Sequence, residues 1–488
     1  MTDAQNAPAK PVHAEPIPAP RRFESRHSGT FGGRKISYRA IAGETHIKDE
    51  AGKPRGAMFS TSYVAEDAGD AAKRPVTFVF NGGPGSSSMW LHMGMLGPKR
   101  VVVPSDARSA GAPPFPVVEN LHCPLDSTDL VFIDPVGTGF SRPVGEGKVE
   151  EFWGLDVDAK SIISFIRTWL TEHKRWNSPR YLAGESYGTT RAVALVERMH
   201  GDFQGLAVNG VLLISAIVDF LTARFDPGNI MPEIGYLPTY AASALYHGKV
   251  QASDRNRFLD EVRTFARTDY AAALLSGAQH DPARRREIAA RMARYTGLSA
   301  EFIERCKLRI EPARFRKELL RDRGLTVGRF DTRYTGVDPD EAGDAPEADA
   351  SSYAIDTAYV AAINAHLAEL GVEMDRPYIG LNREALKKWD WLAKGDNGGN
   401  FLRNWPMAVN VMPALARAQR EQPGFRTFIA NGYFDLATPF HSVEVSMTTN
   451  GVDASRVVMT YYDGGHMMYV HEPSLDALAA DVRSFYKG

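Results

Sequence analysis

The sequence predicts an α/β fold with a doubly wound, mostly parallel sheet. The first observation is a series of short apolar runs of strand length, at 76–80, 130–133, 180–183, 211–214, 426–430 and 456–462. Several of these runs contain β-branched or aromatic residues, as strands buried on both faces of a parallel sheet do. The second observation is that helical patterns separate several of the runs, for instance at 156–176 and 189–201, in the alternation that such a sheet requires.

Two segments precede the first of these runs. Residues 1–25 predict a disordered arm, because the first 22 residues are rich in alanine and proline and lack the continuous apolar run of a signal peptide. Residues 28–65 alternate polar and apolar positions around the turn-rich segment DEAGKPRG, which predicts an antiparallel hairpin. We therefore place the start of the α/β core at residue 26.

The strand pattern is interrupted between residues 226 and 404. This stretch has arginine and glutamate at helical spacing and an acidic loop at 337–350, without strand-like runs of comparable quality. We predict a mainly helical cap insertion at 226–404, set into a core made of 26–225 and 405–488. Because acidic residues interleave with the arginines, a solvated helix face is favoured over a nucleic-acid patch.

Composition narrows the classes of partner. The 488 residues carry 57 Lys plus Arg against 59 Asp plus Glu, a formal charge of −2, so no large net field selects nucleic acid or an anionic membrane. The sequence contains no stretch of about 18 uninterrupted apolar residues, so it predicts no membrane span. A small molecule or a peptide is therefore the favoured partner, and the oligomeric state stays open.

The two cysteines and the N-terminal segment bear on the cellular compartment. Cys123 and Cys306 lie far apart in the sequence, so they predict neither a zinc cluster nor a disulfide framework, although one bridge between them stays open. Without a signal-peptide run, the sequence as written predicts a cytoplasmic protein. Export, or a periplasmic location, is the alternative if the start codon is misassigned.

The pentapeptide GESYG at 184–188 raises a chemical question. It matches the G-x-S-x-G nucleophile elbow and lies between an apolar strand run and a helical pattern, where that motif belongs. Ser186 is thus the candidate nucleophile, on a strained turn that Gly184 and Gly188 leave uncrowded. Glu185 stands directly beside it, although a negative charge there would oppose that of an acyl-transfer transition state. A plain strand-to-helix turn is the alternative.

A serine nucleophile needs a general base and an acid that orients the base. Asp435 follows the run at 426–430 and His466 follows the run at 456–462, in the chain order that this motif predicts. The alternatives are a turn-capping aspartate and a surface histidine, and His471 and Asp463 are rivals nearby. Neither histidine belongs to a metal-ligand spacing, so we expect no metal and no cofactor.

A glycine-rich loop, NGGPGSSS at 81–88, directly follows the run at 76–80. Its backbone N–H groups are not blocked by side chains, as an oxyanion hole requires. It has neither the Walker spacing with lysine nor G-x-G-x-x-G followed by an acidic residue, so a phosphate loop is disfavoured. A purely structural glycine turn is the alternative.

Five motifs, in this order, resemble one family. NGGPGSSS, FIDPVGTGFSR, GESYG, the Asp435 loop and GGHMMY together resemble the serine carboxypeptidases, peptidase family S10, which have the α/β-hydrolase fold and carry an insertion as a lid. The resemblance covers about 75–220 and 425–470. It implies Ser186 as nucleophile, His466 as base and Asp435 as its orienting acid. It also implies that the N–H groups of Gly83 and Tyr187 form the oxyanion hole.

The resemblance gives Glu185 a role as well. Asn81 and Glu185 would hydrogen-bond the free carboxylate of the substrate's last residue, which Glu185 can do only while it is protonated. Two residues depart from the family's pattern, since Ser86 stands where a cysteine is usual and Met95 where a glutamate is frequent. Without that second carboxyl to share its proton, we expect a weaker acid shift of the pH optimum.

The sequence therefore predicts a serine-type carboxypeptidase that releases C-terminal residues through an acyl-enzyme, with a peptide bearing a free C-terminus as its substrate. An esterase, amidase or acyltransferase on the same triad is the alternative among enzymes. A non-catalytic binding or protective partner protein is the alternative from another class. The side-chain preference depends on the insertion, whose fold the sequence does not define.

Overall fold

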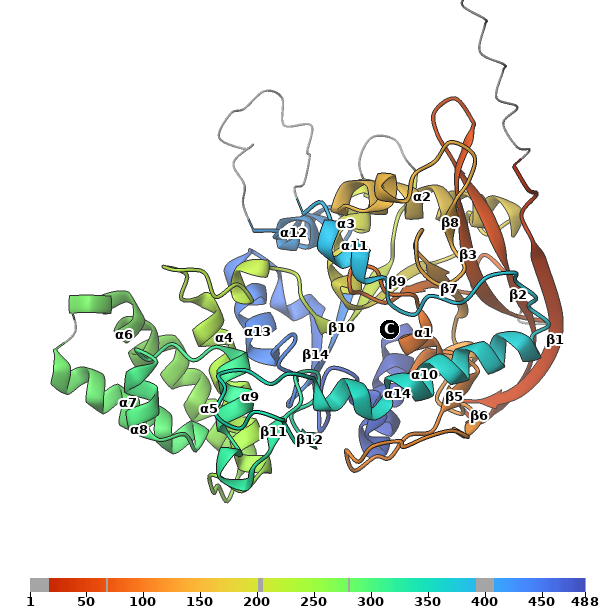
Figure 1. Cartoon of the computed structure of the whole chain (residues 1–488). Helices are drawn as coiled ribbons and strands as arrows, with labels where there is room; N and C mark the ends of the chain where they lie inside the picture. Colours follow the sequence, from red (N-terminus) through yellow and green to blue (C-terminus); the bar gives the residue numbers. More distant parts are fainter. Residues whose placement is uncertain (1–16, 67–68, 201–204, 280, 392–407, 488) are drawn as a thin grey trace, which may run out of the picture.

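The computed structural model describes residues 17–66, 69–200, 205–279, 281–391 and 408–487. A 10-stranded sheet runs through the molecule in the order β1-β2-β3-β7-β4-β9-β10-β13-β14, with β8 (Arg142–Pro143) paired to β3 (Figure 1). The first three strands are antiparallel: β1 (Arg22–Phe31), β2 (Arg34–Lys48) and β3 (Pro54–Ala65). The other six are parallel to one another: β7 (Asp129–Asp134), β4 (Val76–Phe80), β9 (Arg180–Ser186), β10 (Gly210–Ala216), β13 (Arg426–Gly432) and β14 (Val457–Tyr462).

This sheet confirms the predicted fold class. Each apolar run coincides with one parallel strand to within a few residues, and the predicted hairpin is β2 and β3. The arm was predicted too long, because residues 22–25 belong to β1 and pair with β2. Residues of β1 alternate between exposed and only half-buried positions, so the strand lacks the apolar run by which the others were found. Residues 1–16 of the arm lie outside the described residues.

Helices cover both faces of the parallel part. Consecutive strand residues point to opposite faces, so Phe78 and Leu182 join one hydrophobic cluster while Val79 and Ala183 join another. Three helices pack into the first cluster: α2 (Leu155–Glu172), α3 (Tyr187–His200) and α12 (Met412–Glu421). The last helix, α14 (Glu472–Lys487), packs into the second. Burial on both faces explains why these strands are apolar throughout.

Between β10 and β13 the described chain is mainly helical. Besides α12, its helices are α4 (Met231–Tyr246), α5 (Arg255–Phe265), α6 (Ala271–Ser276), α7 (Pro282–Thr296), α8 (Ala300–Arg305), α9 (Pro312–Glu318), α10 (Ala350–Glu369) and α11 (Arg383–Lys388), with two-residue strands β11 (Thr326–Val327) and β12 (Thr335–Gly336). Helices α4 to α9 gather at one side of the sheet, and α10 extends from them toward β5 (Lys99–Val101) (Figure 1). The domain boundary predicted at 404/405 lies outside the described residues.

The arginine-rich helix α7 shows how local sequence sets these elements. Asp281 caps it by accepting a hydrogen bond from the N–H of Ala283, and Pro282 occupies the first turn. Gly297 ends it in the left-handed conformation, at φ 69°. The interleaved acids pair with the arginines, as in the ion pair of Arg284 with Asp269. The helical prediction for this stretch agrees with the structure.

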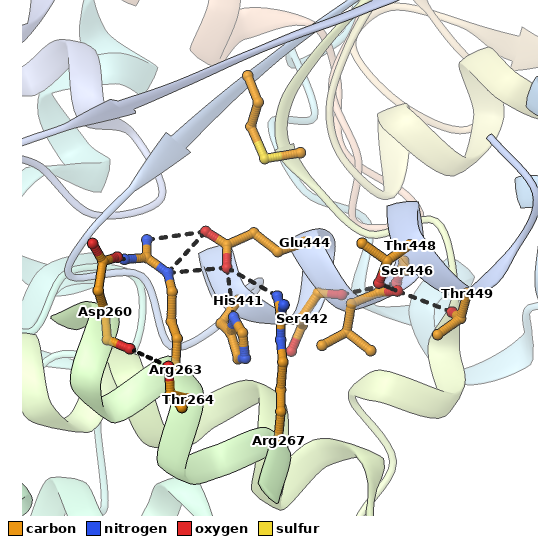
Figure 2. Close-up of polar contacts among 12 residues, drawn as sticks. Asp260, Arg263, Thr264, Arg267, His441, Ser442, Glu444, Ser446, Thr448 and Thr449 are labelled. Carbon is orange, nitrogen blue, oxygen red and sulfur yellow. Dashed lines mark hydrogen bonds and ion pairs between the residues drawn. The ribbon is translucent and has the colours of Figure 1, made fainter. Parts of the chain in front are cut away.

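A half-buried charged cluster joins α5 to α13 (Phe440–Thr449), as Figure 2 shows. The carboxylate of Glu444 accepts hydrogen bonds from Arg263 at 3.0 and 3.1 Å, from the Tyr461 hydroxyl at 2.7 Å and from His441 Nδ1 at 2.5 Å. Arg267 adds an ion pair at 3.7 Å. Although burial alone would raise it, these partners lower the pKa of Glu444 to about 2. The insertion is thus tied to the core by a carboxylate that is charged at neutral pH.

Two further expectations concern cysteines and membranes. Cys123 is buried and Cys306 half-buried, and both are free thiols, so no bridge joins them. In the described part of the chain, no helix is both long and apolar enough to cross a membrane.

Candidate active site

The carboxyl ends of four parallel strands bring the predicted site residues together. Asn81 follows β4, Ser186 ends β9, Asp435 follows β13 and His466 follows β14. Because these ends share one edge of the sheet, the loops that leave them meet there. Ser186 and His466 line the same cavity.

The elbow holds Ser186 in a strained backbone conformation. Its φ is 60°, a left-handed value that a non-glycine residue rarely adopts. Helix α3 begins at the next residue, Tyr187. A β-carbon on Gly184 would lie only 2.2 Å from the carbonyl oxygen of Gly188, so this tight turn needs a residue without a side chain at position 184. Ser186, the last residue of β9, lines the cavity at this turn.

His466 is bound to Asp435. Its Nδ1 lies 2.8 Å from Oδ2 of Asp435, and both side chains are buried. Oδ1 of Asp435 accepts hydrogen bonds from the backbone N–H groups of Ala437 at 2.7 Å and Thr438 at 3.0 Å. Burial alone would raise the pKa of Asp435, but the charge of His466 and these donors hold it below its ordinary value. Asp435 is therefore an ionised acceptor that fixes the imidazole's tautomer.

Contacts from two other segments hold the backbone of His466. The backbone N–H of His466 donates to the carbonyl of Phe330 at 2.5 Å, and the Ser215 hydroxyl donates to the carbonyl of His466 at 2.6 Å. Burial lowers the pKa of the ring, but Asp435 and then Glu185 raise it, and the net pKa lies above its ordinary value. The backbone of His466 is thus held from both the core and the insertion.

The rival residues lie elsewhere. His471 Nδ1 is 2.8 Å from the Ser474 hydroxyl near the start of α14, and Asp463 forms an ion pair with Arg255 of α5. Neither residue lines the cavity that contains Ser186. The geometry therefore favours His466 and Asp435. Among the described residues, no group of three or more His, Cys, Asp or Glu side chains is placed to hold a metal ion.

The glycine loop after β4 lies against the elbow. A β-carbon on Gly82 would approach the backbone nitrogen of Tyr187 to 2.5 Å, so only glycine allows the two backbones to come this close. Gly83 and Tyr187 both line the cavity beside Ser186. One of these residues belongs to the glycine loop and the other begins α3, so each brings a backbone amide to the cavity, as an oxyanion hole requires.

Glu185 is buried between two hydrogen-bond donors. Asn81 Nδ2 donates to Oε1 at 3.0 Å, and the hydroxyl of Tyr469 donates to Oε2 at 2.7 Å. The N–H of Leu91 donates to Oδ1 of Asn81 at 3.1 Å, which fixes the orientation of that amide. Burial raises the pKa of Glu185 to about 7, against the lowering effects of His466, Tyr469 and Asn81. Glu185 is thus largely protonated in mild acid.

Tyr469 is a residue that the sequence analysis missed. It lies in GGHMMY, three positions after His466, but nothing in the motif shows where its side chain points. Met95, at the position where the family frequently has a glutamate, is fully buried in the same hydrophobic cluster as Tyr469. Glu185 therefore has a phenol as its neighbour, and a phenol donor favours the ionised carboxylate.

The cavity has a volume of about 420 Å³ and combines core and insertion residues. The core provides Asn81, Gly83, Glu185, Ser186 and His466. The insertion provides polar and charged residues, Arg329, Asp331, Ser351, Ser352 and Asp356, and apolar ones, Phe330, Tyr334, Ile355, Leu381, Leu386 and Trp391. A cavity of this size holds one or two amino-acid residues of a substrate.

An elbow serine, a His–Asp pair after later strands and a glycine loop on one parallel sheet define an α/β-hydrolase. Residues 50–224 match the family model of the serine carboxypeptidases, peptidase family S10. This stretch of the chain is thus similar to the family that its motifs resemble.

Two relatives and one solved structure are similar to the chain. Over 159 residues the chain is 31% identical to the pheromone-processing carboxypeptidase KEX1 of Cryptococcus gattii. This match covers 32% of this chain and 22% of that protein. Over 178 residues it is 25% identical to serine carboxypeptidase-like 36 of Arabidopsis thaliana, covering 36% of this chain and 34% of that protein. The matches thus span about a third or less of these relatives' lengths. A prohormone-processing carboxypeptidase from Saccharomyces cerevisiae has the same fold, with a TM-score of 0.56, 16% identity, and coverage of 92% and 91% of the two chains.

Proposed function

We propose that this protein is a serine-type carboxypeptidase that releases C-terminal residues from peptides. The observation that carries the proposal is Glu185, a buried carboxyl with a pKa raised to about 7 that lines the cavity beside Ser186. A protonated carboxyl next to Asn81 can donate a hydrogen bond to a carboxylate. A substrate carboxylate bound there would present its peptide carbonyl to the elbow.

In this proposal the hydroxyl oxygen of Ser186 attacks the last peptide carbonyl while Nε2 of His466 takes the hydroxyl proton. Asp435 accepts the Nδ1–H bond and stabilises the imidazolium. The N–H groups of Gly83 and Tyr187 stabilise the oxyanion. His466 then gives its proton to the leaving amine, and the C-terminal residue departs. Water, deprotonated by His466, hydrolyses the acyl-enzyme and restores Ser186.

The proposed reaction needs a protonated Glu185 and a neutral His466, and the two groups influence each other's pKa. The negative charge of Glu185 raises the pKa of His466, so protonating Glu185 favours the neutral imidazole that acts as base. Above about pH 7 Glu185 becomes charged and repels the substrate carboxylate. We therefore expect kcat/KM to have a bell-shaped dependence on pH. Its basic limb reports the coupled titration of Glu185 and His466.

Two alternatives need different experiments. A non-catalytic binding protein would not react with a fluorophosphonate, whereas the proposed enzyme forms one adduct at Ser186 that Ser186→Ala abolishes. An esterase or amidase would cleave blocked dipeptides with free and amidated C-termini equally well. The proposed carboxypeptidase favours the free acid at pH 6, and equal rates on the two peptides would overturn this proposal.

A further inference from the structure

Arg191 is a fully buried arginine of helix α3, four residues after Tyr187. Its Nη1 donates a hydrogen bond to the carbonyl oxygen of Asn81 at 2.6 Å, and its Nε donates to Oδ2 of Asp158 on α2, also at 2.6 Å. Arg191 does not line the cavity that contains Ser186. It can therefore affect the reaction only through the residues that it holds.

Arg191 connects the two backbone segments that bring the proposed oxyanion-hole amides to the cavity. Gly83 lies in the glycine loop that begins at Asn81, whereas Tyr187 begins α3. The main chain of Arg191 belongs to α3, and its guanidinium holds the first residue of the loop. Its Cζ also lies 5.1 Å from the ring centroid of Tyr187 and 5.5 Å from that of Phe80, the last residue of β4. One side chain thus spans the end of β4, the loop and the start of α3.

The shape of the guanidinium suits this bridge. Its N–H donors lie in one rigid plane, so the bond from Nε to Asp158 fixes the direction in which Nη1 points toward Asn81. A β-carbon on Gly188 would lie 3.0 Å from the carbonyl oxygen of Asn81, so the loop and the first turn of α3 are already in contact. Lysine has a single ammonium on a flexible stem and cannot hold both partners in this fixed arrangement. The bridge therefore requires arginine.

Stability does not explain why Arg191 is buried here. Its Nη2 is buried without a hydrogen-bond partner among the described residues, and an unpaired buried donor weakens the fold. Burial raises the pKa of Asp158 above its ordinary value although the charge of Arg191 opposes this. Apolar residues can often replace a buried ion pair of this kind without loss of stability. A role in positioning the loop explains an arginine at this place better.

We propose that Arg191 is a positioning residue that holds the glycine loop against the start of α3. Through this contact it sets the separation of the Gly83 and Tyr187 N–H groups. The same contact places the Asn81 amide that donates to Glu185. This inference deepens the proposed carboxypeptidase function and rests on it.

The two effects of Arg191 predict different kinetic changes. Oxyanion-hole amides stabilise the transition state of every acyl substrate, so their displacement lowers kcat for an ester and for a peptide. The Asn81 amide would bind only a free chain end, so its displacement raises KM for a free-acid peptide and leaves KM for an ester unchanged. A general loss of folded protein would lower both rates by one factor and would change neither KM.

The test is Arg191→Lys, which keeps a positive charge beside Asp158 but loses the planar fork. The substrates are a blocked free-acid dipeptide and an ester of a blocked amino acid, and active sites are counted by fluorophosphonate titration. We expect kcat per active site to fall about 100-fold on both substrates, and KM to rise about fivefold on the dipeptide alone. The matched control is Arg198→Lys, because Arg198 lies about two turns further along α3 and pairs with Asp156 of α2. It should keep the wild-type constants.

A second variant covers the case in which Arg191→Lys unfolds. Arg191→Met combined with Asp158→Leu removes both buried charges, a change that often leaves stability unaltered. The double variant should unfold at a urea concentration close to that of the wild-type protein. It should still show the loss of kcat on both substrates.

Wild-type kcat and KM in a folded Arg191 variant would overturn the inference. A fall in activity that disappears once rates are divided by the number of labelled Ser186 sites would overturn it as well, because Arg191 would then act on folding alone. Failure of the proposed function looks different. A wild-type protein that cleaves the ester but treats free-acid and amidated dipeptides alike is not a carboxypeptidase, and the loss of kcat on the ester would still support the role of Arg191. If the wild-type protein cleaves neither substrate, the rate of fluorophosphonate labelling replaces kcat, and equal rates in wild type and Arg191→Lys overturn the inference.

Discussion

The hydroxyl of Tyr469 donates a hydrogen bond of 2.7 Å to Oε2 of Glu185, and both side chains are buried. A second carboxyl in this place would share a proton with Glu185 and raise its pKa, whereas a phenol donor stabilises the charged form and lowers it. Burial is still the larger effect, and it raises the pKa of Glu185 to about 7. The balance between these two effects controls the pH range in which a chain end can bind.

Removing the phenol donor should extend peptide cleavage to higher pH. Tyr469→Phe deletes a hydrogen bond that favours ionised Glu185, so the pKa of Glu185 rises. A charged hydrogen bond contributes about 1.5 kcal/mol, which corresponds to an upward shift of about one pH unit. The measurement is the basic limb of kcat/KM against pH for a blocked free-acid dipeptide. An ester substrate without a carboxylate is the control, and a downward shift of the limb would contradict the role given to Tyr469.

Replacing Glu185 by glutamine should remove the basic limb. The amide of Glu185→Gln donates a hydrogen bond at every pH, so cleavage of the free-acid peptide should persist from pH 7 to 9. Glu185→Ala, which has no donor, should raise KM at all pH values. If Glu185→Gln lost activity above pH 7 as the wild-type protein is expected to, Glu185 would not be the titrating group.

The orienting acid should be identified by comparing two aspartates. Asp435→Asn leaves His466 Nδ1 opposite an amide and disturbs the imidazole's tautomer, so kcat should fall by about 10⁴-fold. Asp463→Asn breaks only a surface ion pair with Arg255 and should change kcat less than about twofold. Steady-state kinetics on the same dipeptide distinguishes them. A larger effect at Asp463 would reverse the assignment made here.

The ion pairs of Glu444 should contribute to the free energy of unfolding. Glu444→Gln leaves Arg263 and Arg267 without their carboxylate, which should lower the free energy of unfolding by about 3 kcal/mol at pH 7. The pKa of Glu444 is about 2 in the folded protein, below its ordinary 4.5. Its contribution is therefore complete above about pH 4.5 and is lost as the pH falls toward 2.

Urea unfolding at several pH values tests this prediction. Glu301→Gln, which removes an exposed carboxylate 4.0 Å from Arg305, is the control and should change the midpoint very little. Equal midpoints for Glu444→Gln and wild type at pH 7 would show that the cluster adds no net stability.

Local patterns were sufficient for the parallel strands. Each strand there is buried on both faces, so residues such as Phe78 and Val79 are all apolar and the run is visible without its neighbours. The elbow is similarly local, because Gly184, Ser186 and Gly188 lie within one turn. Strand β1 was missed because it is half-exposed, and its pairing with β2 involves backbone atoms that leave no apolar pattern.

The sequence by itself determined the order of strands and loops that brings Asn81, Ser186, Asp435 and His466 to one edge of the sheet, because chain order and strand direction fix which loops share that edge. Only the tertiary structure decided that Tyr469 is the partner of Glu185, from 284 positions away, and that Asp356 faces the same cavity. Those contacts depend on how a helix of the insertion and the turn after β14 pack on the sheet. Packing of that kind leaves no periodic signal in the residues that it brings together.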